Sequence, residues 1–99
     1  MKEIDEEFYK RADAHIHLSN DQINEKVTIG KVSASNMYAT ARFNAYVSAC
    51  GWNSSKEMAK SKQETLDYFV NEYRKMLEEN LDDYIENFNS YMMSVERDT

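Results

Sequence analysis

The feature that most constrains the fold is a window from Val32 to Ser55 that carries a single charged side chain, Arg42. Charged residues make up 30% of the whole chain, so this window differs sharply from its surroundings. It is rich in alanine and serine, and Gly30 and Gly51 frame it. A helix with so few charges needs neighbours that cover it. The window therefore predicts the buried middle helix of the fold.

The composition of the chain predicts an all-α protein. Its 99 residues include no proline and two glycines, so little in the sequence interrupts a helix. The residues that favour strands are sparse, and a hydrophobic content of 41% excludes a disordered chain. We expect a single helical domain over residues 1–99, built as a bundle of three long helices.

The first two helices are expected at Asp5 to Val27 and at Ser33 to Cys50. An apolar stripe defines the first helix, and its acidic residues lie in the first turn, where the helix dipole favours them. Ser33 is a suitable N-cap for the second helix, and Gly51 is placed to end it in a left-handed conformation. The second helix is apolar on two sides, one of them lined with alanines, which predicts a helix sandwiched between others.

The third segment begins with a capping box, Ser54 to Glu57. Its apolar residues then follow alternating steps of three and four, as in a coiled-coil seam. An unbroken helix from Ser55 to Ser94 would be about 60 Å long, whereas a compact chain of this size is roughly 33 Å across. The seam comprises Leu66, Val70, Tyr73, Leu77, Leu81, Tyr84, Phe88, Tyr91 and Val95.

Two arrangements resolve this excess length. We favour a break near Asn80, which could cap a fourth helix with Asp82 and Asp83 in its first turn. In the alternative, the helix projects from the monomer and a second subunit covers an interface of Tyr84, Phe88 and Tyr91. In both cases we expect a homodimer, because seven tyrosines and six methionines exceed what a small core buries and tyrosine is enriched at interfaces.

Several short segments of the sequence, taken together, resemble a small and mostly proteobacterial family classed as a domain of unknown function. The resemblance covers nearly the whole chain and implies a short, soluble, helical bacterial protein. It implies no activity, and so assigns no functional residues. The segments are Phe8-Tyr9, Ala12-Asp13, Ile16-x-Leu18, Gly30 to Ser35, Ala41 to Ala45 and Met76 to Ile85.

No motif in the sequence indicates a metal, cofactor or catalytic site. His15 and His17 point about 160° apart on a helix, and Asp13 with His17 lacks a third ligand. Cys50 is expected to be a buried structural residue, since a helix C-terminus opposes thiolate formation. The loop at Gly30 departs from the phosphate-binding pattern at two positions and is expected to be a turn between helices.

Arg42 is the most informative single residue. Tyr38 and Tyr46 lie four positions to either side, so the guanidinium could stack between two rings. We expect it to pair with a carboxylate of a neighbouring helix, Asp13 first, and so to fix the packing register. A second hypothesis is a pocket beside this helix that binds a small anionic ligand through Arg42, Asn44, Asp13, Tyr38 and Tyr46.

Charge and composition also limit the partners. The net charge is −6 and the lysines are interspersed with glutamates, which disfavours nucleic acid and anionic membranes. The sequence shows no signal peptide and no transmembrane stretch, and it has a single cysteine, so we expect a cytoplasmic protein. The acidic segment from Glu72 to Glu86 is expected to be a solvated face, or else a docking surface for a basic partner. The interpretation we favour is a non-enzymatic protein-interaction or accessory module with an unidentified protein partner.

Overall fold

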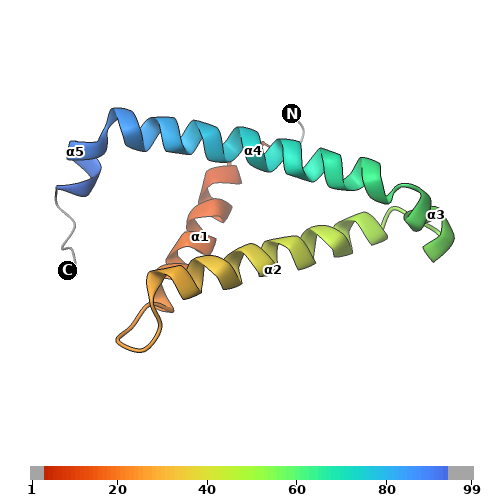
Figure 1. The fold of residues 1–99 in the computed structure, drawn as a ribbon, viewed down its shortest axis with the longest axis horizontal. Coiled ribbons are helices and arrows are strands. Elements are labelled where there is room, and N and C mark those ends of the chain that lie inside the picture. Colours follow the sequence, from red (N-terminus) through yellow and green to blue (C-terminus); the bar gives the residue numbers. More distant parts are fainter. Residues whose placement is uncertain (1–3, 94–99) are drawn as a thin grey trace. The chain divides into compact units, whose positions relative to one another are not determined.

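The computed structural model describes residues 4–93, and over this range every regular element is an α-helix. The all-α class is therefore confirmed, whereas the bundle of three long helices stays a prediction. The chain divides into two compact units, residues 1–51 and residues 52–99. The helices are α1 (Phe8–Asp21), α2 (Ile29–Ala49), α3 (Ser55–Lys60), α4 (Lys62–Glu86) and α5 (Phe88–Met92) (Figure 1).

The predicted bounds of the first helix are wrong at both ends. The Asp5 carboxylate accepts a hydrogen bond from the Glu7 N–H at 3.0 Å and pairs with Arg11 at 3.1 Å, so it lies in the turn before α1. The pairing with Arg11 lowers the pKa of Asp5. After α1, Asn24 Oδ1 accepts the N–H groups of Lys26 and Val27 at 2.8 and 2.9 Å. These side-chain bonds hold a turn where the periodicity predicted helix.

α2 begins four residues before its predicted start. The Thr28 hydroxyl caps it by accepting the Lys31 N–H at 3.3 Å, so Ser33 lies inside the helix and is not the N-cap. At the other end, the Gly51 N–H donates to the Ser48 carbonyl at 3.0 Å. None of the described glycines has a positive φ, so the predicted left-handed end at Gly51 is wrong.

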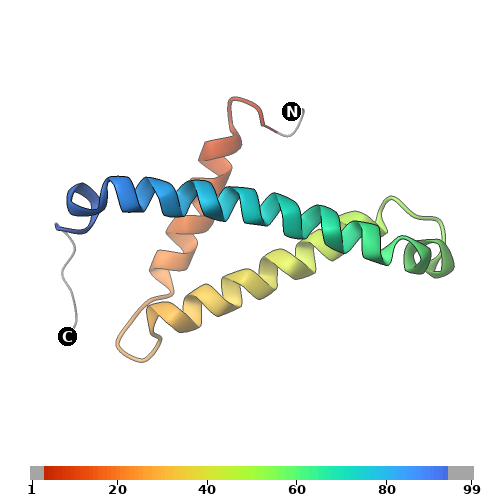
Figure 2. The same cartoon turned by 45° about the horizontal axis from the view of Figure 1, so that its top comes forward.

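α1 and α2 meet near the loop that joins them and then diverge (Figures 1 and 2). Here Asn36 Nδ2 donates to the Ser19 hydroxyl at 2.6 Å. Val32, 4% exposed, is the one buried hydrophobic residue in the described part of the chain. The prediction of a buried, sandwiched middle helix is therefore wrong. α1 has 14 residues against 21 in α2, so it is too short to cover α2 along its length.

In the second unit, the Ser54 cap of the predicted capping box is present at the start of α3, but the reciprocal bond from Glu57 goes to Asn53 instead of Ser54. The Ser54 hydroxyl accepts the Glu57 N–H at 3.2 Å, while Glu57 accepts the Asn53 N–H at 3.1 Å. The chain bends at Ser61, where φ is −98° and ψ is 5°, and α4 follows. Its 25 residues correspond to about 37 Å.

The break predicted near Asn80 is wrong, because α4 continues through this residue. Asn80 Nδ2 donates to the Met76 carbonyl at 2.7 Å, one turn back in the same helix, so the side chain supports the helix instead of capping a new one. The helix ends instead at Asn87, where φ is −110° and ψ is 26°. The predicted end of the third segment, Ser94, lies outside the described residues.

Candidate functional site

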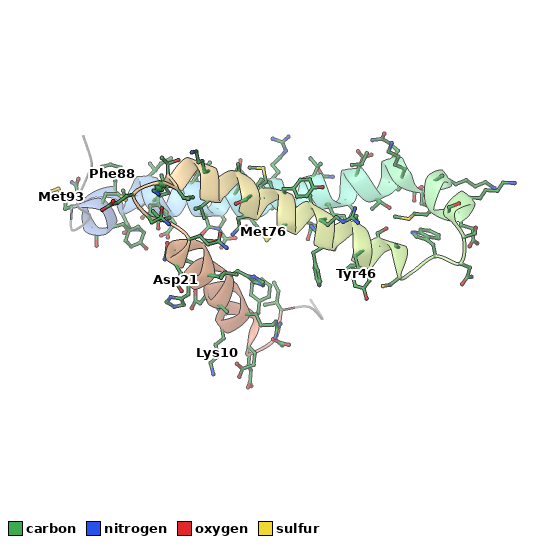
Figure 3. All side chains as sticks on the ribbon, turned by 90° about the horizontal axis from the view of Figure 1, so that it is seen from below. Lys10, Asp21, Tyr46, Met76, Phe88 and Met93 are labelled. Atoms are coloured by element: carbon green, nitrogen blue, oxygen red, sulfur yellow. The ribbon has the colours of Figure 1, made fainter. Side chains whose placement is uncertain are left out.

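The predicted site around Arg42 lies on an exposed face of α2. Tyr38 and Tyr46 are 71% and 64% exposed, and Figure 3 shows Tyr46 projecting away from the ribbon. The Tyr46 ring contacts Phe43, with ring centroids 6.0 Å apart. Among the described residues, Arg42 makes no hydrogen bond, ion pair or ring contact. The predicted stacking between two tyrosines and the predicted pair with Asp13 are therefore not found.

The remaining residues of the predicted pocket do not join Arg42. Asp13 is exposed on α1, and Asn44 is half-buried on α2. Neither makes a hydrogen bond or an ion pair within the described part of the chain. Residues 4–93 contain no group of three His, Cys, Asp or Glu residues placed to hold a metal ion. Cys50 is exposed, so the prediction of a buried cysteine is wrong.

What α2 presents is an open apolar surface with one unpaired cation. We call this surface the α2 face. Its large side chains are exposed, and ordinary soluble chains rarely leave such a continuous apolar area uncovered. The charge-free window signalled this surface, but we assigned it to the inside of the chain. The α2 face consists of Tyr38, Arg42, Phe43 and Tyr46.

A second exposed apolar surface runs along α4. Leu66, Val70, Tyr73 and Leu77 follow steps of four, three and four, so they lie on one side of the helix. All four side chains are about half exposed, and we call them the α4 stripe. The predicted seam is confirmed only along α4, because this helix ends at Glu86 and the last predicted seam residue, Val95, lies outside the described residues.

The three predicted interface residues lie at the junction of α4 and α5. The Tyr91 hydroxyl donates to the two oxygens of the Asp83 carboxylate at 3.2 and 3.1 Å, and Asn87 Nδ2 donates to Asp83 Oδ1 at 2.9 Å. The rings of Tyr84 and Tyr91 meet edge to face, with centroids 5.0 Å apart. Phe88 is 48% exposed. Asp83 thus ties α5 to the end of α4.

The bond from Tyr91 to Asp83 has a measurable consequence. Donation to the carboxylate raises the pKa of Tyr91, and the charge of Asp83 adds to this effect. The bond therefore stabilises the fold below the ordinary tyrosine pKa of 10.0, and this contribution is lost as pH rises through the folded-state value. We expect NMR titration of ¹³C-labelled tyrosines to show one ring with a raised pKa, which Asp83→Asn lowers. An unchanged titration in Asp83→Asn would contradict the contact.

Comparison with known proteins finds a family model and a solved structure that match this chain. A family model described as a protein of unknown function, DUF3144, matches residues 8–85. The NMR structure of the protein NB7890A from Shewanella sp. is 39% identical to this chain, with a TM-score of 0.76. The match covers 95% of this chain and 99% of that one. No functionally curated protein matches the sequence. In the described residues, no helix is long and apolar enough to cross a membrane.

Proposed function

The chain belongs to the DUF3144 family of proteins of unknown function, and from its exposed helix faces we propose that it is a non-enzymatic protein-interaction module. The observation that carries this proposal is the α2 face, where two exposed tyrosines and an exposed phenylalanine flank one arginine. Tyrosine and arginine are the residue types that most often supply binding energy at protein interfaces. The absence of other charges on this face removes the largest desolvation cost of binding.

The α2 face also specifies the chemistry of its partner. An exposed guanidinium without an ion pair favours a carboxylate, and the rings around it favour apolar side chains. Ala41 and Ala45 lie on the same helix and allow a second backbone to approach closely. We therefore propose that α2 binds an amphipathic helical segment of another protein, with a glutamate or aspartate placed to meet Arg42. The proposed location is the cytoplasm, which the single cysteine supports.

The ligand-binding hypothesis stays a prediction with weaker support. A small anion is usually held by convergent polar groups in a concave site. Arg42 lies instead between two widely exposed rings, and neither Asp13 nor Asn44 is bonded to it. If the hypothesis is correct, inorganic phosphate or citrate raises the melting temperature of the wild-type chain and not that of Arg42→Ala.

The proposed function is tested by affinity capture followed by mass spectrometry. We expect partner proteins to be captured by the wild-type chain and lost in the double variant Phe43→Ser with Tyr46→Ser. The matched control is Tyr9→Ser, which removes a similarly exposed ring from α1. The melting temperatures of the three chains should agree closely, because exposed side chains contribute little to stability. Identical captured proteins for all three chains would overturn the proposal.

A further inference from the structure

We propose that a second copy of this chain pairs with α4 along the α4 stripe, antiparallel, about a two-fold axis between Asn71 and Glu72. This pairing uses a surface other than the α2 face and so does not depend on the proposed function. An amphipathic stripe with steps of three and four is the pattern that packs side chains of one helix between those of another. A two-fold pair places the same surface on both copies, so the stripe must complement itself.

The apolar residues of the stripe meet this requirement in one register. With Leu66 opposite Leu77 of the second copy, Val70 comes opposite Tyr73 of the second copy, and the two-fold axis repeats both pairs. Each layer then joins side chains whose sizes are compatible, two leucines in the outer layers and a valine with a tyrosine in the inner ones. The half-exposed area of all four side chains becomes covered at once.

The polar residues next to the stripe match in the same register. Gln63 comes opposite Asn80 of the second copy, so an amide meets an amide at each end of the apolar segment. Both side chains are exposed in the structure. Burying two amides within an apolar seam costs little free energy when they are hydrogen-bonded to each other. A shifted register would separate them, and each amide would then lose its partner.

Charge complementarity supplies the strongest argument. Asp67 and Arg74 flank the stripe on one side of α4. The antiparallel register places Asp67 diagonally across from Arg74 of the second copy, two positions from direct opposition, twice per dimer. Within the described residues, Arg74 forms no ion pair and Asp67 is bonded to the Gln63 amide at 2.9 Å. A parallel pairing would instead place Tyr73 against Tyr73 and leave Arg74 facing Phe69. Two chains of net charge −6 repel each other, so a neutral stripe with matched flanks is the surface along which they can approach.

The bounds of α4 agree with this pairing. After the bend at Ser61, α4 begins at Lys62, and in the proposed register Lys62 comes opposite Leu81 of the second copy. The paired segment is therefore about 30 Å long, close to three heptads. Tyr84 lies beyond it, and so does the whole of α5.

Sedimentation equilibrium of two tyrosine variants of the full chain tests the proposal. Tyr73 on the stripe and Tyr68 on the opposite side of α4 are similarly exposed, at 49% and 53%. We expect Tyr73→Glu to raise the dimer dissociation constant about 100-fold or more, because the change enters the interface twice. Tyr68→Glu should change it less than about threefold, with helix content by circular dichroism equal in both variants.

Two results would overturn the pairing. One is a wild-type chain that sediments as a monomer at every concentration, and the other is an equal loss of affinity in both variants. The double variant at Phe43 and Tyr46 is expected to remain dimeric. Loss of its captured partners without loss of the dimer would separate the two surfaces, so each proposal can fail while the other stands.

Discussion

Replacing Val32 with aspartate is expected to lower the free energy of unfolding by about 3 kcal/mol or more. Val32 is 4% exposed and lies in the first turns of α2, where α1 and α2 meet. The substitution removes a packed isopropyl group and buries a carboxylate without a partner there, and burying an unpaired charge is among the costliest single changes. Urea denaturation followed by circular dichroism measures the loss.

Val47→Asp is the matched control, since it makes the same chemical change in the same helix at a side chain that is 49% exposed. Its cost should stay within about 1 kcal/mol, part of it from placing a negative charge near the C-terminus of α2. Equal losses in the two variants would contradict the conclusion that the burial of Val32 stabilises the first unit.

The second large effect is expected from mixing two charge-reversed chains. Asp67→Arg alone places arginine diagonally across from arginine twice in the dimer, and Arg74→Asp alone places aspartate diagonally across from aspartate twice. Each variant should bind itself about 30-fold or more weakly than the wild type does. In an equimolar mixture, each heterodimer contains two complementary pairs, so dimers should reappear. Analytical ultracentrifugation of the separate and mixed samples measures this.

The chain that carries both reversals serves as the control for this experiment. Its two-fold pair again matches arginine with aspartate at both positions, so we expect near-wild-type dimerisation. If the single variants dimerise as well as the wild type, or if the mixture dimerises no better than its components, these two residues do not face each other. If Asp67 or Arg74 instead acts within its own chain, mixing the two variants should not restore the dimer.

The fold features that were predicted correctly are those with a local physical signal. Composition predicted the all-α class, the spacing of a serine and a glutamate predicted the Ser54 cap, and steps of three and four predicted the α4 stripe. The resemblance to a family of unknown function is likewise confirmed by the match over residues 8–85. For the cap and the stripe, residues close in sequence are sufficient to determine the feature.

The helix ends were missed because they depend on competing hydrogen bonds. Asn24 is a turn residue that the apolar spacing of the first helix obscured, yet two backbone N–H groups bond to its side chain and end the helical path. Asn80 and Asn87 are the same residue type on the same segment, but the first supports α4 from within and the second ends it. Residue type alone does not distinguish these two outcomes.

The candidate site around Arg42 stays a prediction. The charge-free window and Arg42 do mark the most unusual surface of the first unit. A low charge density indicates that another surface packs against the helix. It does not show whether that surface belongs to the same chain or to a second one, and the prediction assigned it to the same chain. The same ambiguity explains the prediction that Asp13 pairs with Arg42. In the structure, Arg42 has no carboxylate partner among the described residues.

The central claim is that apolar helix faces left exposed on one chain are covered by another chain. Sedimentation equilibrium of the wild-type protein tests this claim most directly, over a concentration range of about 1 to 100 μM, within which specific complexes of moderate affinity dissociate. The account requires a species of twice the mass of one chain that dissociates on dilution. A single species with the mass of one chain across the whole range would contradict it.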